Sequence, residues 1–251
     1  MTQTLVICFG VALLAAAVVL LKDRFWPPDP DEEPREDVAE YIAMMVGVLY
    51  ALILGLSLVS VWDTHSGASD HVATEASAVH QVRLLAESLP EPQASDVRSG
   101  ADTYVRHVTR VEWPAMKEGQ PLGAEGWRLL DSLRAANRLP DSAPASGQAV
   151  SQEVLAQLST LDDARRGREG DTGGGLSPIL WLGLIIGGVL TVAFMFMFGV
   201  ERSFTHVAMA MGLAALITFL VLLIHQLDQP FNGILAVDAT PFTRYFPLSS
   251  P

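Results

Sequence analysis

Apolar residues gather in four long stretches that contain no Asp, Glu, Lys or Arg. They cover residues 4–21, 41–62, 180–200 and 207–225. Each is close to the roughly 20 residues that a helix needs to cross a hydrocarbon core about 30 Å thick. Aromatic side chains stand at or near the ends of the stretches, as in aromatic belts of membrane proteins: Trp26, Tyr41, Trp62, Trp181 and Phe204. The pattern predicts four transmembrane helices.

The first stretch is the one that resembles a secretory signal. No Lys or Arg precedes it, and no small-x-small cleavage site precedes Lys22, so we expect a retained helix. Basic residues near the spans are balanced between the two sides of the membrane, and the positive-inside rule therefore does not set the orientation. The short loops carry Lys22, Arg24, Arg35 and Arg202, and the opposite side carries Arg165, Arg166, Arg168 and Arg244.

The segment between the second and third spans has helical periodicity. Val72, Ala76, Val79 and Ala86 follow the spacing of one buried stripe, and no proline separates them from the second span. One helix is therefore expected to run from residue 41 to about residue 89, where prolines end it. Three further stripes follow: Val97, Ala101, Tyr104, Val108 and Val111; then Trp127, Leu130 and Leu133; then Val150, Val154, Leu158 and Leu161.

Prolines at 114, 121 and 140–144 are expected to break the chain between these helices, and the Gly-rich residues 167–175 to form a flexible linker. In the tail, Asn232 and Gly233 followed by residues 234–237 suggest a turn and a short strand. The predicted fold is all-α and integral to the membrane. Two helix pairs (1–62 and 177–226) flank a helical soluble domain (63–176), and a tail (227–251) follows.

Composition narrows the function. The net charge is −12 and there is no basic stripe, which argues against nucleic acid as a partner. Cys8 is the single cysteine, and the six histidines have no metal-ligand spacing. No phosphate-binding loop and no nucleophile elbow is present. We therefore predict no cofactor, no metal site and no enzyme activity; membrane lipid is the expected surrounding.

One face of the second span carries small and polar residues among apolar ones. It consists of Gly47, Tyr50, Leu54, Ser57, Leu58 and Val61, and His65 extends it past the membrane. This face is either a pore lining that gates by dewetting or a packing surface, since Gly and Ser let helices approach closely. The sequence alone favours packing. Gly183, Gly187 and Gly188 of the third span are also expected to be packing residues.

Other polar residues are candidates for function. Glu201 and Arg202 lie in the loop between the last two spans, as solvated charges or as a weak ion pair. His225 and Asp228 are three apart at the end of the fourth span, and form either a pH-sensitive pair or, as we favour, an interfacial hydrogen bond. Glu75 is either a solvated carboxylate or an inward one with a fixed partner.

Several short motifs resemble a known family. The sequence from Val46 to Ala51, the pair Val61-Trp62, the run Thr74-Glu75-Ala76 and the tail Leu227 to Gly233 are similar to the bestrophin-like membrane family of unknown function. Bestrophins are pentameric anion channels whose second helix lines a hydrophobic neck. The resemblance implies that the candidate face described above lines a neck. It also implies that the protein lies in the cell membrane and that its soluble domain, residues 63–176, is in the cytosol. The chain lacks the aromatic-rich neck motif and the acidic calcium-binding run of bestrophins.

These observations predict a homo-oligomeric, channel-like membrane protein that conducts small anions along its second helix, with five copies implied by the resemblance. The alternative is a non-conducting membrane scaffold or sensor whose helical domain binds a partner.

Overall fold

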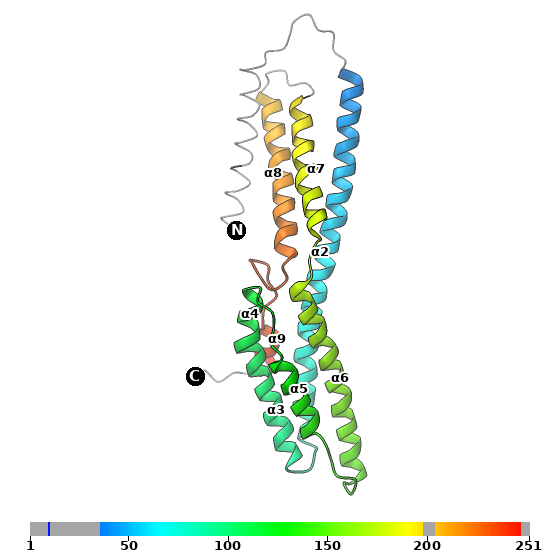
Figure 1. The fold of residues 1–251 in the computed structure, drawn as a ribbon, viewed down its shortest axis with the longest axis vertical. Coiled ribbons are helices and arrows are strands. Elements are labelled where there is room, and N and C mark those ends of the chain that lie inside the picture. Colours follow the sequence, from blue (N-terminus) through cyan, green and yellow to red (C-terminus); the bar gives the residue numbers. More distant parts are fainter. Residues whose placement is uncertain (1–9, 11–35, 198–203, 247–251) are drawn as a thin grey trace, which may run out of the picture. The chain divides into compact units, whose positions relative to one another are not determined.

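The computed structural model describes residue 10 and residues 36–197 and 204–246. The predicted first span, apart from Gly10, lies outside the described residues, as do Glu201 and Arg202. The described part is helical, as expected, and contains no strand. Its helices (Figure 1) are α2 (Glu36–Ala86), α3 (Gln93–His107), the π-helix η1 (Val108–Glu112), α4 (Trp113–Lys117), α5 (Glu125–Ala136), α6 (Ala145–Gly173), α7 (Pro178–Met197), α8 (Phe204–Leu227) and α9 (Thr240–Tyr245).

The chain divides into two compact units. Residues up to 62 and 176–228 form the membrane unit, and residues 63–175 with the tail from 229 form the domain. Within the described residues, two helices are long and apolar enough to cross a membrane, in α2 and α8. A third crossing is added when α6 and α7, separated by a short break, are counted together. The predicted membrane character is confirmed, whereas the arrangement of four spans remains a prediction.

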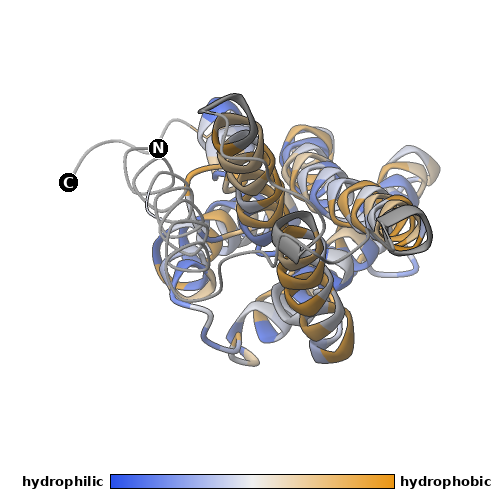
Figure 2. Cartoon of the chain, turned by 90° about the horizontal axis from the view of Figure 1, so that it is seen from above, coloured by the Kyte–Doolittle hydropathy of each residue, from blue (hydrophilic) through white to orange (hydrophobic). Residues whose placement is uncertain are grey.

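The helix α2 is a single helix of 51 residues that begins in the membrane unit and ends in the domain. It passes Gly67 without interruption, because the mid-helix glycine weakens a helix by only about 1 kcal/mol. Turn hydrogen bonds at residues 87–89 close it just before Pro90. The expected continuous helix is therefore present. Figure 2 colours the helices of the membrane unit mostly orange, while the domain helices mix apolar and polar residues.

The domain buries one apolar core. α3 packs on α5, and α5 packs on α6. Core side chains come from each predicted stripe, among them Val72, Val79, Val97, Leu130, Leu133, Leu158 and Leu161. The tail joins the same core through Phe231, Phe242 and Phe246.

Three local expectations are wrong. Pro114 does not break the chain, because the helix continues from η1 through Pro114 to Lys117. The expected linker at 167–175 is helical to Gly173, because Arg168 within it is fixed inside the core. The tail forms the expected turn, with Gly233 at a φ of 93°, but no strand follows. Instead the Val237 N–H donates a hydrogen bond to the Pro230 carbonyl, 2.8 Å away.

Candidate functional site

Four ionisable side chains meet in the interior of the domain. Glu75 comes from α2, Glu112 from η1, and Arg165 and Arg168 from α6. None of the four is more than 2% exposed. Buried charges are rare unless they are paired, so this group, the buried charge network, is the most unusual feature of the described residues.

The two arginines each bind a carboxylate with two nitrogens. Arg168 donates from Nε and Nη2 to Glu75, and its Nη2 also reaches Glu112 at 2.8 Å. Arg165 donates from Nη1 and Nη2 to Glu112, at 2.9 and 2.6 Å. The two-pronged arrangement matches the planar geometry of guanidinium and carboxylate. Glu112 therefore bridges both arginines.

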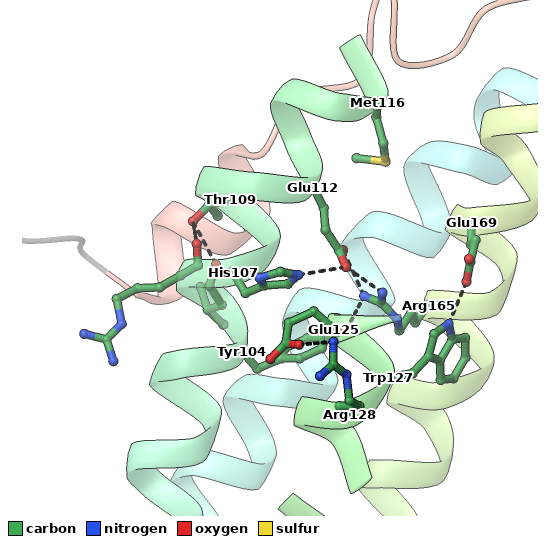
Figure 3. Close-up of polar contacts among 12 residues, drawn as sticks. Tyr104, His107, Thr109, Glu112, Met116, Glu125, Trp127, Arg128, Arg165 and Glu169 are labelled. Carbon is green, nitrogen blue, oxygen red and sulfur yellow. Dashed lines mark hydrogen bonds and ion pairs between the residues drawn. The ribbon is translucent and has the colours of Figure 1, made fainter. Parts of the chain in front are cut away.

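Two neighbours complete the network. The Tyr104 hydroxyl donates to Glu75 at 2.6 Å and accepts from Arg165. His107 Nε2 lies 3.4 Å from Glu112, and its side chain is 15% exposed, so it is the member closest to solvent. Figure 3 shows His107 and Arg165 converging on the Glu112 carboxylate from opposite sides.

Electrostatics favour the charged forms of Glu112, Arg165 and Arg168. Burial by itself raises the pKa of Glu112, but the hydrogen bonds and positive charge of Arg165 and Arg168 outweigh it and leave that pKa lowered. Burial alone likewise lowers the pKa of both arginines, and their carboxylate partners raise it above the ordinary value. Burial, and then the charge of Glu75, raise the pKa of Tyr104 well above its ordinary range. Glu112 therefore stays ionised beside the two arginines.

Aromatic rings surround the guanidinium groups. Arg165 lies over the Trp127 ring at 5.1 Å, and Arg168 lies 5.9 Å from the Trp113 ring. Trp127 is oriented by its indole N–H, which donates to Glu169 at 2.9 Å (Figure 3). A Cβ at Gly126 would overlap the Arg165 guanidinium and the Glu112 carboxylate. The position therefore requires glycine for space.

The π-helix η1 changes which residues after Val108 face the core. Residues of an α-helix turn by about 100° each, and on that spacing Val111 belongs to the buried stripe. A π-turn bonds i to i+5 and so takes in one extra residue; here the Trp113 N–H bonds the Val108 carbonyl. Each residue after the π-turn therefore points in about the direction that the residue before it would have in an uninterrupted α-helix. Trp113, which would point outwards in an uninterrupted α-helix, is buried as a result, while Val111, which we expected inside, is 57% exposed.

The network ties helices together. Among the described residues no group of three or more His, Cys, Asp or Glu side chains could hold a metal ion. Removing one partner of a buried ion pair costs about 3–5 kcal/mol, because the other charge is left unpaired. The arrangement can therefore fix α2, η1 and α6 in one register.

The candidate face of the second span packs within its own chain. Tyr50, Leu54 and Val61 are buried in a cluster with Leu184 of α7 and Ile224 and Leu227 of α8. Ser57 is buried and donates to the Ile53 carbonyl, while Gly47 and Leu58 are half-buried. The packing interpretation, which the sequence favoured, agrees with this burial.

The remaining predicted residues contact different parts of the chain, except that His225 and Asp228 both contact Trp181. Glu75 is the inward carboxylate of the two alternatives. His65 contacts the Leu235 carbonyl at 2.8 Å. Asp228 accepts from the Leu176 N–H and the Trp181 indole N–H, at 2.7 and 3.1 Å. His225 packs its ring edge against Trp181.

Sequence reasoning missed most of the network. In the sequence analysis, Arg165 and Arg168 were considered only as basic residues near the third span, for the orientation in the membrane. Glu112 was not a candidate site residue. The available signal was weak: two arginines at i and i+3 follow directly on the stripe Val154, Leu158 and Leu161 and therefore continue its face. Only Glu75, beside an apolar stripe, was singled out.

The described helices thus define a helical membrane protein with a helical domain inserted between its membrane-spanning segments. The Bestrophin-like domain family matches residues 9–242, and the chain belongs to this family. The fold is similar to the crystal structure of a bacterial bestrophin homolog from Klebsiella pneumoniae, in a point-mutant form. The TM-score is 0.67 at 12% sequence identity, over 95% of this chain and 94% of that one. No match was found among curated protein sequences.

Proposed function

We propose that this chain is the subunit of a homo-oligomeric, channel-like membrane protein that conducts small anions along α2. Five copies, the cell membrane and a cytosolic domain belong to the same proposal and rest on the family. The observation that carries it is α2 itself. One helix continues from an uncharged membrane segment into the domain, so a movement of the domain reaches the membrane segment through a continuous helix.

The surface of α2 offers two candidate pore faces. The predicted face can line a pore only after α7 and α8 move away from its buried side chains. This face consists of Gly47, Tyr50, Leu54, Ser57, Leu58, Val61 and His65. The opposite face is exposed in the single chain and carries Val48, Leu52 and Val59. This apolar stripe can line a dewetted neck without rearrangement, so we place the neck there.

Chloride flux into liposomes tests conduction. Wild-type protein is expected to carry chloride, and Leu54→Ala and Ser57→Trp are compared with it. Absence of chloride flux at every pH and calcium level would overturn the proposal.

A Cys8→Ser background then allows cysteines at Val48, Leu52 and Val59 to be compared with matched cysteines at Leu54 and Ser57. A charged thiol reagent is expected to block flux through the first set; block through the second set alone would place the pore on the predicted face.

A non-conducting sensor or scaffold is the second candidate. It is favoured by the buried charge network, which gives the domain a defined structure of its own. The two candidates differ in oligomeric state, because a single subunit has too few spans to enclose an ion path. A monomer or dimer by mass photometry in mild detergent would support the sensor; a larger ring supports the channel.

A further inference from the structure

The tail turn exposes two consecutive large apolar side chains. Ile234 is 60% exposed and Leu235 is 44% exposed, directly after Gly233 with its φ of 93°. Val111 and Leu155, elsewhere in the domain, are each exposed singly. Single exposed apolar residues are ordinary on the surface of a water-soluble domain. The adjacent pair in the tail is therefore the feature to explain.

Contacts on both sides of the pair hold this part of the tail in place. Before the pair, Phe231 is buried and its ring lies 5.9 Å from the ring of Trp113. After the pair, the Val237 N–H donates to the Pro230 carbonyl at 2.8 Å and closes a loop. Ile234 and Leu235 therefore belong to a closed loop, residues 230–237, that is fixed to the domain core.

His65 relates the position of this loop to the membrane segment of α2. Its Nε2 lies 2.8 Å from the Leu235 carbonyl oxygen. α2 is one unbroken helix, and His65 follows Trp62, the last residue of its uncharged stretch, by three residues, which is about 4.5 Å along the helix axis. The headgroup layer on each side of the hydrocarbon core is roughly 5–8 Å thick. The backbone of Leu235 is therefore at about the level of the lipid headgroups.

The chemistry of the loop fits a zwitterionic lipid. Residues 228–240 contain Asp228 and Asp238 and no Lys or Arg, so the loop has no charge that attracts anionic headgroups. Apolar side chains at this level are favoured when they enter the boundary between headgroups and acyl chains. Trp62, at the same end of the α2 membrane segment, is 61% exposed, as expected of an interfacial aromatic residue.

We propose that the loop from Pro230 to Val237 is a lipid-binding element that inserts Ile234 and Leu235 into the interfacial layer of the bilayer. Its ligand is the glycerol and upper acyl-chain region of a zwitterionic phospholipid. Because His65 contacts the loop, the element attaches the start of the domain part of α2 to the membrane surface. The proposal rests on the membrane-spanning segments and not on conduction, so absence of chloride flux leaves it standing.

Quenching of a fluorescent label by lipid tests the insertion. Single cysteines are introduced in the full-length Cys8→Ser chain as Ile234→Cys or Leu235→Cys, with Val111→Cys and Leu155→Cys as matched controls at exposed apolar positions. Each is labelled with a small fluorophore and reconstituted in phosphatidylcholine vesicles. Phosphatidylcholine with a nitroxide near the top of its acyl chain is expected to cause a loss of fluorescence at 234 and 235 and none at 111 and 155. Loss at 234 and 235 that is no larger than in the controls overturns the proposal.

Iodide in the water distinguishes lipid from a second copy of the chain. Labels at Ile234 and Leu235 are expected to be protected from iodide, in comparison with Leu155, and quenched by the nitroxide lipid. Protection from iodide without quenching by the nitroxide lipid would mean that a second copy covers the loop, and would overturn the lipid assignment.

Exchange of lipids tests the class of ligand. Replacement of part of the phosphatidylcholine by phosphatidylglycerol should leave the nitroxide quenching at 234 and 235 unchanged, because the loop contains no basic residue. Quenching that appears only with the anionic lipid overturns the choice of a zwitterionic lipid.

Discussion

Arg168 and Glu75, 93 residues apart in the sequence, form a two-pronged ion pair in which neither side chain is exposed to solvent. The pair joins the domain part of α2 to the last turns of α6. α6 is followed after four residues by α7 of the membrane unit, and α2 itself continues into that unit. The pair is thus located on two of the three chain segments that connect the domain with the membrane unit.

Glu75→Ala should destabilise the domain strongly. The change leaves Arg168 buried with Glu112 as its only carboxylate, and a broken buried pair costs about 3–5 kcal/mol. Thermal unfolding in detergent measures the effect. Asp163→Ala, which removes an exposed pair with Arg166, is the matched control and should change stability by less than about 0.5 kcal/mol.

The double variant Glu75→Met with Arg168→Met distinguishes a charge effect from a packing effect. An apolar pair of similar volume is often neutral or stabilising where either single change is costly. We expect the double variant to be more stable than Arg168→Met alone. Strictly additive losses would show that the two side chains do not act as a pair.

Acid should remove the contribution of Glu112. Its pKa in the folded chain is lowered from the ordinary 4.5, against the effect of burial, by hydrogen bonds from Arg165 and by the charge of Arg168. A lowered folded pKa adds stability that is present above 4.5 and is lost as the pH falls through the folded value. Wild type should therefore be more stable than Glu112→Gln at pH 5, and this margin should shrink below pH 4.5. Denaturant unfolding at each pH measures it; a margin that keeps growing below pH 4.5 contradicts the assignment.

The sequence predicted the elements better than the site, for reasons visible at single residues. Stripes of apolar side chains report which face of a helix is buried, so α2, α3, α5 and α6 were all expected. The pattern of polar and apolar residues along the chain does not show which charged side chains form ion pairs in the fold. Arg166 has 67% of its side chain exposed, yet Arg165 and Arg168 on either side of it are buried. Their burial depends on carboxylates from two other helices, and apolar stripes do not mark those carboxylates.

Two glycine substitutions should change stability in opposite directions. Gly126→Ala places a methyl group on the Arg165 guanidinium and the Glu112 carboxylate, and overpacking of this kind costs about 1–3 kcal/mol. Gly67→Ala adds a methyl group where nothing lies within 4 Å, in the middle of α2, and should stabilise by roughly 0.5–1 kcal/mol through helix propensity. The two variants are compared by thermal unfolding. A stabilising Gly126→Ala would show that Arg165 is not confined as described.

The packing of α2 on α7 depends on two adjacent glycines. A Cβ at Gly187 would lie 2.5 Å from the Tyr50 ring, and one at Gly188 would lie 2.9 Å from the Tyr50 hydroxyl oxygen. Gly187→Ala should therefore lower the Tm of the membrane unit, whereas Gly183→Ala, with nothing within 4 Å, should not.

Tyr50→Phe should be neutral or stabilising, because the buried hydroxyl has no hydrogen-bond partner. Combining Gly187→Ala with Tyr50→Ala should recover part of the loss, since the smaller side chain relieves the overlap. A double variant no better than the sum of its parts would mean that α2 and α7 do not meet at these residues, and the face containing Tyr50 would then be free to line a pore.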